Sequence, residues 1–179
     1  MYSTSISPVF TNEGGSNGFN LINNIIYNAG SGPVANNVSG STILAGAMNY
    51  NNLYTTGATL GIWNGVSQAN LAAWRAATGL DVNSSSVSVA FANIAANDFH
   101  LTVADPNLYG FGSTSNGTYG LGIRTLVPDD FFGASRNRTE VYMGAHQIVP
   151  VITINPAPPA SLSGCANQTF TISANATVT

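Results

Sequence analysis

The stretch Phe19–Asn28, with the sequence FNLINNIIYN, carries the strongest strand signal in the chain. It is rich in β-branched and aromatic residues, and turn-forming Gly, Asn and Ser residues lie on both sides of it. A similar motif returns later, because Asn-Asn-Ile-Ile-Tyr beginning at Asn23 resembles Asn-Asn-Leu-Tyr beginning at Asn51. The two motifs start 28 positions apart (51 minus 23). A repeat of this length is typical of solenoid proteins, in which each coil stacks on its neighbour.

The repeat also predicts what lies inside the coils. Asn24 and Asn52 are one such repeat apart, so we expect their side-chain amides to stack as a ladder. Apolar alternation predicts further strands, at residues 41–45, 47–54, 87–91 and 99–103.

One segment, residues 67–79, departs from the strand pattern. Its Ala, Leu, Gln and Arg residues favour a helix of about three turns. Ser67 is the expected N-cap, and Gly79 is expected to end the helix in the left-handed conformation. Leu71 and Trp74 share one face with Ala77 or Thr78, and this face is predicted to lie against the β-structure.

Composition excludes several classes of partner. Charged residues make up 6% of the chain, against about a quarter in average soluble domains. The net charge is -3, there is no lysine, and the only cations are four scattered arginines, Arg75, Arg124, Arg136 and Arg138. Nucleic acid and anionic membrane surfaces both require clustered basic residues, so neither is expected as a partner. No apolar run approaches the roughly 18 residues of a membrane helix, and membrane insertion is therefore not expected.

The chain is predicted to contain more than one structural region. Residues 1–149 are expected to form the β-domain, and the Gly-rich segment 105–145 is expected to cover its end. Residues 150–160 are Pro-rich and predict an extended linker. Residues 161–179 alternate like a first strand, but about 20 residues cannot form a β-sandwich. We therefore expect this second domain to be incomplete or to borrow structure from elsewhere.

A family resemblance emerges from motifs spread over residues 19–147. They are the segments 50–54, 71–81, 89–91, 98–101, 122–124, 129–130, 132–134 and 140–145, together with Asn83 and Ser84. This order resembles the last coils and C-terminal seal of parallel β-helix proteins of the pectate-lyase-like superfamily. The sequence departs from that pattern at Asp105-Pro106, where Ser-Pro is usual, and at His146 or Gln147, where an acidic residue is usual.

The resemblance implies an all-β fold, namely the end of a right-handed parallel β-helix with one short inserted helix and a C-terminal extended tail. Similar proteins are large bacterial surface proteins in which immunoglobulin-like modules follow the β-helix. Residues 161–179 would then be the first strand of such a module. Cys165 stands where these modules usually carry the first cysteine of a disulfide, with its partner beyond Thr179. The implied location is extracellular or on the bacterial cell surface.

The charged residues do not form a recognisable catalytic pattern. Asp129 and Asp130 are adjacent and should point to opposite faces of a strand. Asp81 and Asp98 are interpreted as structural caps in turns. His100 is interpreted as a packed or surface residue. His146, with no second histidine or aspartate close in sequence, is not expected to bind a metal. The sequence therefore predicts no enzyme activity, no cofactor and no metal.

Exposed aromatic rings can stack on the faces of sugar rings, so several aromatic residues are candidates for ligand contact. Trp63, expected in a loop before Asn64-Gly65, is the best candidate for an exposed platform, with Tyr54 as a neighbour. Trp74 is expected instead to pack the helix onto the β-structure.

Three functional hypotheses follow. The first is a non-catalytic structural or adhesive module of a large secreted or cell-surface protein. The alternatives are a fragment of a polysaccharide lyase or glycosidase whose active coils lie upstream, and a glycan-binding module. The expected partners are other domains or copies of the same surface protein, in which copies could assemble into a filament, with extracellular polysaccharide as a further candidate.

Overall fold

The computed structural model describes residues 1–13, 20–38, 43, 47–109, 128–136, 141–148, 152–155 and 175–178. The chain divides into two compact units, Met1–Ile148 (unit 1) and Val149–Thr179 (unit 2). Strands with one short α-helix and two 3-10 turns form the regular structure of the described residues, so their fold is broadly all-β. The predicted strand at 41–45 and most of the Gly-rich segment 105–145 lie outside the described residues, and so does Cys165.

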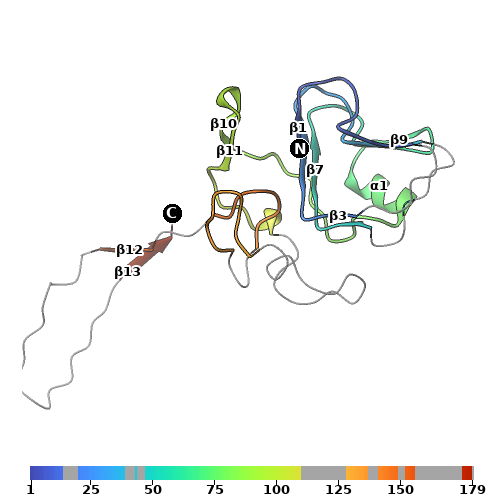
Figure 1. Cartoon of the computed structure of the whole chain (residues 1–179). Helices are drawn as coiled ribbons and strands as arrows, with labels where there is room; N and C mark the ends of the chain where they lie inside the picture. The colour runs from blue at the N-terminus through green and yellow to red at the C-terminus, as the bar shows by residue number, and fades with distance from the viewer. Residues whose placement is uncertain are drawn as a thin grey trace, which may run out of the picture. The chain divides into compact units, whose positions relative to one another are not determined.

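Three rows of parallel strands form the first part of unit 1 (Figure 1). The first row holds β1 (Tyr2–Ser3), β4 (Ile25–Asn28) and β7 (Asn52–Thr55). The second holds β2 (Phe10–Asn12), β5 (Ala35–Asn37) and β8 (Gly61–Trp63), and the third holds β3 (Leu21–Ile22) and β6 (Met48–Asn49). Consecutive strands along the chain thus belong to different rows, and the chain returns to each row after 25 to 27 residues.

That distance differs slightly from the predicted repeat. Tyr2 lies opposite Tyr27, and Tyr27 lies opposite Tyr54. Hydrogen bonds of asparagine side chains between neighbouring turns of the chain join residues 25 or 27 positions apart. The predicted spacing of 28 was therefore wrong by one to three residues. Asn51 lies across from Asn24 rather than Asn23, and its Oδ1 accepts from the backbone N–H and the side-chain amide of Asn24.

A left-handed corner explains the break in the expected long strand. The segment 19–28 was predicted as one strand, but Asn23 has φ = 61° and separates β3 from β4. Tyr50, with φ = 53°, separates β6 from β7 in the next repeat. Asparagine tolerates this conformation better than most residues, so the Asn-rich motif encodes a corner as well as a strand.

A ladder of asparagine side chains runs from strand to strand along the second row, and not at the predicted pair Asn24 and Asn52. Asn12 donates to Asn37 at 2.7 Å, and Asn37 donates to Asn64 at 3.1 Å. Asn52 does not stack on Asn24. Its side chain instead donates to the carbonyl oxygen of Val87 and accepts from the Val87 N–H. The type of interaction was predicted correctly, and its location was wrong.

The helix is shorter than predicted and starts later. α1 spans Leu71–Thr78, and its N-cap is Asn70, whose side chain accepts from the N–H of Ala73. Ser67 was expected to cap it but lies in β9 (Val66–Gln68). The two-residue turn Asn64-Gly65, with positive φ at both residues, favours a hairpin and joins β9 to β8 in antiparallel pairing. Gly79 ends the helix with φ = 69°, as predicted.

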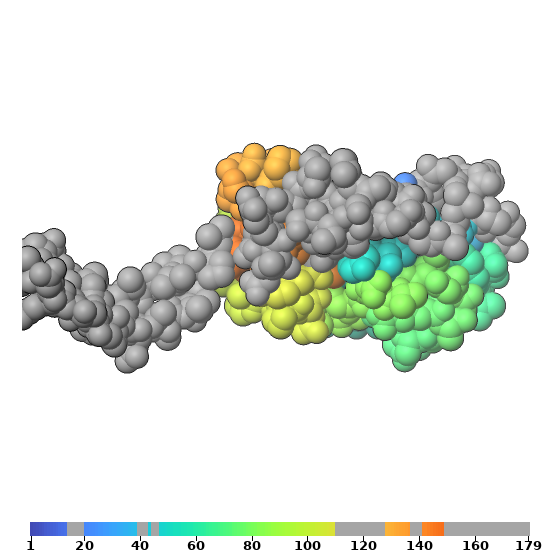
Figure 2. All heavy atoms as spheres, turned by 90° about the horizontal axis from the view of Figure 1, so that it is seen from below, coloured from blue at the N-terminus to red at the C-terminus, as the bar shows by residue number. Residues whose placement is uncertain are grey.

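The helix contributes one large side chain to the core, as predicted. Trp74 is 1% exposed and packs against Gly61, where an added Cβ would lie 2.7 Å from its ring. The outer residues of α1 are mainly exposed alanines, in the green region of Figure 2. A first cluster of buried residues surrounds Trp74, formed by Ile26, Val34, Ala35, Met48, Leu53, Leu60 and Leu80.

A second cluster joins the rows to the later part of unit 1. Ile25 faces away from Ile26, as neighbours on a strand do. It packs in a cluster that also holds Val89, Leu101, Leu108, Tyr142 and Met143. Here β10 (Phe91–Asn93) and β11 (Asp98–Leu101) form an antiparallel pair, with 3-10 turns at Ile94–Ala96 and Pro106–Leu108. Both strands are displaced from the predicted ranges.

Unit 2 contains one described pair of strands. β12 (Ile152–Asn155) pairs antiparallel with β13 (Asn175–Val178). β12 lies inside the Pro-rich segment 150–160 that was interpreted as a linker. None of the helices in the described ranges is long and apolar enough to cross a membrane.

The close approach of neighbouring rungs generates a stability prediction at Gly57. A Cβ at this position would lie 2.0 Å from the carbonyl oxygen of Ser31, which belongs to the backbone and cannot rotate away. We expect Gly57→Ala to lower the free energy of unfolding by about 3 kcal/mol or more, the upper end of overpacking costs. Urea denaturation followed by tryptophan fluorescence measures this loss.

Gly65→Ala is the matched control. The space around Gly65 is open, and its φ of +83° makes backbone strain the only expected cost, about 1–2 kcal/mol. Equal losses in the two variants would contradict close stacking at Gly57.

Candidate functional site

The predicted ligand residue Trp63 is less available than the sequence suggested. It is the last residue of β8 and not part of a loop. Its half-buried ring lies edge-to-face on Trp74, with ring centroids 5.9 Å apart, and packs against the first core cluster. Trp63 therefore takes part in holding α1 on the strands.

Tyr54 lies in a different row, so the structure does not bring the two predicted ligand residues together by strand pairing. The rings of Tyr54 and Tyr27 are 5.0 Å apart, and those of Tyr27 and Tyr2 are 5.6 Å apart and stacked. All three tyrosines are half-buried. We call Tyr2, Tyr27 and Tyr54 the tyrosine row, and it presents a continuous line of rings on one face of the first row of strands.

Asp81 is the centre of a buried polar network. Its side chain is fully buried, yet it lies among polar hydrogens rather than apolar atoms. One carboxylate oxygen accepts from Trp74 Nε1 at 3.0 Å, and the other accepts from Asn51 at 3.0 Å and Ser84 Oγ at 2.6 Å. Its φ of 56° places it in a left-handed turn just after α1. The interpretation of Asp81 as a structural residue fits these bonds.

Arg75 completes this turn without pairing with the carboxylate. Its Nε donates to the carbonyl oxygen of Asp81 at 2.8 Å, and its terminal nitrogen donates to the carbonyl oxygen of Ser84. One arginine of α1 therefore fixes the backbone on both sides of residues 82 and 83. The network ties the helix to the strands, because Asn51 also donates to the carbonyl oxygen of Leu21.

Asp130 is likewise a buried carboxylate that holds the backbone around it through hydrogen bonds. One oxygen accepts from the N–H groups of Phe132 and Ala134, and the other accepts from the N–H of Gln147. Burial opposes ionisation of Asp130, but these three donors outweigh it and lower the pKa of its carboxyl below the usual value. The adjacent Asp129 is exposed and accepts from Ser135. The two were predicted to point to opposite faces of a strand, but Asp129 forms only an isolated bridge with Ser135, and Asp130 holds the turn that follows it.

Two histidines lie together where the sequence suggested that His146 would be isolated. The rings of His100 and His146 are 4.8 Å apart at 76°, and His100 stacks on Phe132 at 3.6 Å. His100 Nδ1 contacts the carboxylate of Asp98. The expectation that no second histidine lies near His146 was wrong, because β11 brings residue 100 to it. Within the described ranges, no group of three His, Cys, Asp or Glu side chains could hold a metal ion.

His146 also bridges two segments through a backbone contact. Its Nδ1 accepts from the N–H of Leu101 at 2.8 Å, so in the neutral ring the proton lies on Nε2. Burial, together with the neighbouring His100, lowers the pKa of His146, while Asp130 and Asp98 act in the opposite direction. The hydrogen bond to His100 lowers the pKa of Asp98.

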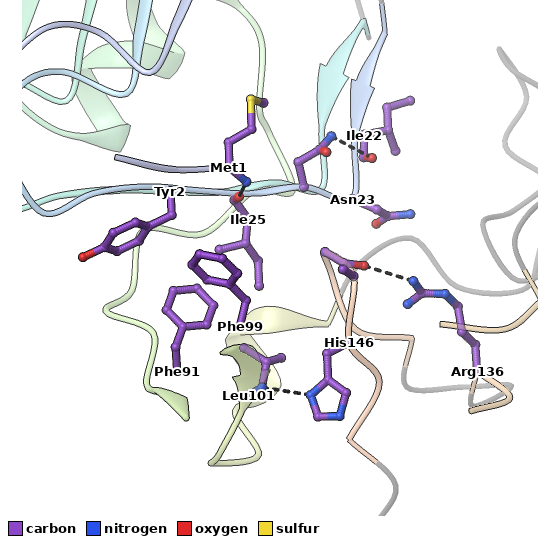
Figure 3. Close-up of a pocket in the computed structure, with 13 residues that line it drawn as sticks. Met1, Tyr2, Ile22, Asn23, Ile25, Phe91, Phe99, Leu101, Arg136 and His146 are labelled. Carbon is purple, nitrogen blue, oxygen red and sulfur yellow. Dashed lines mark hydrogen bonds between the residues drawn. The ribbon is translucent and has the colours of Figure 1, made fainter. Parts of the chain in front are cut away.

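A cavity of about 470 Å³ opens beside this histidine pair (Figure 3). Phe91 and Phe99 line it from the β10–β11 pair, and Ile25 lines it from β4. Arg136 lines it as well. Both of its terminal nitrogens donate to backbone carbonyls, of Tyr142 at 3.2 Å and Gly144 at 3.0 Å. The α-amino group of Met1 donates to the carbonyl oxygen of Ile25 at 2.6 Å, and burial lowers its pKa.

Sequence reasoning missed this cavity because its walls come from separate parts of the chain. Arg136 was noted only as one of four cations, and nothing in its sequence neighbourhood marks it as buried. A local signal did exist for the aromatic wall, since Phe91 and Phe99 flank a turn-forming Asn-rich segment. Their pairing across a hairpin, with ring centroids 5.5 Å apart, could have been inferred from it.

Removal of the Asp81 carboxylate should destabilise unit 1 strongly. Asp81→Ala would leave the donors of Trp74, Asn51 and Ser84 without their acceptor in a buried site. Since each unsatisfied buried group costs about 1–3 kcal/mol, we expect a loss of about 3–5 kcal/mol in the free energy of unfolding by chemical denaturation. Asp129→Ala, at an exposed carboxylate with one described partner, should cost less than about 1 kcal/mol. Similar losses in both variants would refute the central position of Asp81.

The lowered pKa of His146 predicts a dependence of stability on pH. A histidine that binds protons less readily when folded stabilises the protein above its unfolded pKa of about 6.5. That stability declines as the pH falls below 6.5 and levels off below the folded pKa. His146→Asn can keep an acceptor for the Leu101 N–H but does not titrate. Thermal unfolding measured across this pH range should therefore show a shallower slope in the variant, and an unchanged slope would contradict the prediction.

Comparison with known proteins adds no assignment: the chain matches no family model, no curated protein and no solved structure.

Proposed function

We propose that unit 1 is the terminal part of a right-handed parallel β-helix and serves as a non-catalytic structural or adhesive module of a large secreted or cell-surface protein. The observation that carries the proposal is the register of the three rows. The chain returns to the same row after 25 to 27 residues and pairs in parallel each time. Such pairing is what coils of a β-helix require, and it supports the family resemblance found in the sequence.

Side chains in equivalent positions strengthen this proposal. The tyrosine row places one ring on each successive strand, and the ladder Asn12–Asn37–Asn64 places one amide at the end of each of β2 and β5 and one directly after β8. Gly30 and Gly57 lie against the backbones of Thr4 and Ser31, so successive turns of the chain are in direct contact. Repeats that contact only their neighbours are the basis of solenoid stability.

The roles of the carboxylates favour a structural module over an enzyme. Asp81 and Asp130 each accept three hydrogen bonds from within the fold. Asp105 caps a 3-10 turn, and Asp129 accepts from a serine. Carboxylates in a glycosidase act as a pair separated by about 5–10 Å across the substrate, whereas these carboxylates are engaged in holding turns.

The tyrosine row is the surface we propose for adhesion. Its rings are half-buried, and Tyr54 stands at one end of the described row. Stacked aromatic faces can bind sugars or another protein surface. Tyr54 is a better probe of this role than Trp63, because truncation of Trp63 would also remove its contact with Trp74.

The pairing of β12 with β13 supports a second β-module after residue 149. We propose that residues 161–179 begin an immunoglobulin-like domain and that Cys165 takes part in a disulfide there. Other domains or copies of the same surface protein would then be the partners of unit 1.

Surface display and catalysis are tested on the native polypeptide in the cells that make it. Intact cells are treated with proteinase K and probed with an antibody to unit 1, because a chain without lysine is a poor target for amine-reactive labels. The proposal predicts loss of the signal from intact cells. Retention of the signal until lysis would overturn the cell-surface assignment, and release of unsaturated uronic acids from pectate by the purified polypeptide would overturn the non-catalytic one.

Two variants in the same cells separate scaffolding from adhesion. Gly57→Ala should reduce the amount of displayed protein, because it disrupts the stack. Tyr54→Ala should leave display unchanged, and reduced attachment of these cells to polysaccharide-coated surfaces would assign adhesion to the tyrosine row. Normal attachment would remove that row from the proposal. Gly65→Ala serves as the control for both.

A further inference from the structure

We propose that the cavity beside His146 binds a small organic anion, with an apolar body against Phe91 and Phe99 and a carboxylate at the end lined by Arg136 and His146. Its volume of about 470 Å³ falls within the range of about 300–1,000 Å³ that is usual for ligand sites. Tyr2, at the other end of the tyrosine row from Tyr54, also lines this cavity. The inference does not depend on the proposed structural role.

The apolar wall is built from aromatic rings that hold one another in place. Phe99 lies 5.5 Å from Phe91 and 5.8 Å from Tyr2, measured between ring centroids. Phe91 also meets Tyr2 edge-to-face at 6.2 Å. Phe99 is nevertheless 37% exposed. Burial of an exposed aromatic ring by a ligand is favourable at about 25 cal/mol per Å² of apolar area, so this wall favours a flat or extended apolar body.

The polar end carries positive charge that its immediate contacts do not neutralise. Arg136 is 6% exposed, and both terminal nitrogens donate to neutral carbonyl oxygens. Its Nε is buried and has no hydrogen-bond partner among the described residues. Asp130 acts on it electrostatically, but its two oxygens already accept three backbone N–H groups. A buried charge without a close counterion is costly, and a bound carboxylate would supply one.

His146 adds a donor to the same end. Its Nδ1 accepts from Leu101, so the neutral ring carries its proton on Nε2. In Figure 3 His146 lies between Leu101 and Arg136, and Arg136 lies at the end of the drawn residues farthest from Tyr2. The described lining residues include no aspartate or glutamate, so an anion entering the cavity meets no charge of its own sign in the lining.

The remaining polar groups argue against a neutral sugar as the ligand. Asn24 lines the cavity, but its amide donates to the carbonyl oxygen of Ile22 at 3.1 Å. A sugar would have to desolvate many hydroxyl groups against walls of Phe91, Phe99 and Ile25, and desolvated hydroxyls without partners are costly. An aromatic or medium-chain monocarboxylate needs a single polar anchor, which the Arg136 end supplies.

Isothermal titration calorimetry of the full chain with 2-naphthoate tests the proposal, with the uncharged 2-naphthylmethanol as its neutral counterpart. We expect saturable binding of the acid at least about tenfold tighter than that of the alcohol, since one charge-assisted bond contributes about that factor. Equal affinities, or no saturable binding of the acid, would overturn the proposal.

Substitutions at Ala145 test the charge without disturbing Arg136. Ala145 is exposed and lines the cavity. Ala145→Glu places a negative charge at the polar end and should weaken 2-naphthoate binding by at least about tenfold, whereas the isosteric Ala145→Gln should change it less than about threefold. Equal affinities in the two variants would show that the acid does not bind beside residue 145.

A second pair of variants locates the apolar body. Phe99→Ala should weaken binding at least about tenfold through the loss of one aromatic wall. Phe131→Ala is the control, because Phe131 is 80% exposed and does not line the cavity. Each variant is compared by thermal unfolding with the parent chain, so that binding is judged on folded protein. Loss of binding in Phe131→Ala with retention in Phe99→Ala would place the ligand elsewhere and refute the inference.

Discussion

Backbone hydrogen bonding between strands 25 to 27 residues apart is the constraint on which the rest of unit 1 depends. Each strand in the three rows has only two to four residues, and strands this short are not stable alone. They persist because each pairs with its equivalent in the next turn of the chain. This pairing requires close contact, so small residues such as Gly57 occur where two backbones meet.

The same stacking of strands determines which hydrogen-bond partners the polar side chains in the interior find. Asparagines that follow the strands lie inside the stack, where an unpaired amide would be costly. Asn37 both accepts from Asn12 and donates to Asn64, so each amide finds a hydrogen-bond partner in the neighbouring turn of the chain. A charged side chain could not be repeated in this way, because like charges would face each other at every turn. The low content of charged residues is thus compatible with this internal arrangement.

Asp81 is the exception, and its place explains why it is tolerated. It lies where the regular rows give way to α1 and no equivalent carboxylate faces it. Three donors from Trp74, Asn51 and Ser84 replace the water that an exposed carboxylate would bind. Through these bonds the carboxylate connects the helix to the strands.

The sequence predicted the elements that depend on local signals. The β-rich segment around Tyr27, the helix with its terminal Gly79 and the burial of Trp74 were all predicted from residue type and spacing. Prediction failed where a residue served two roles. Ser67 is a suitable N-cap by residue type. It lies instead in β9, because the two-residue turn before β9 pairs that strand with β8.

The candidate site was less predictable, because its members meet only through tertiary structure. His100 and His146 are 46 positions apart, and Arg136 reaches the cavity by bonding to carbonyls at Tyr142 and Gly144. No periodic pattern connects these residues. Trp63 and Tyr54, by contrast, were selected for their ring type, and the structure gives both of them packing partners that sequence alone did not reveal.

The left-handed corner at Asn23 links the register of the rows to the position of the later segments. Its φ of 61° separates β3 from β4. It also directs the carbonyl oxygen of Asn23 to the N–H of Gly144 at 2.6 Å. Gly144 itself has φ = 79°, and a Cβ there would lie 3.1 Å from Ile25. One asparagine therefore determines where the strand turns, and one glycine allows residues 141–148 to approach that turn, so this corner positions one wall of the cavity.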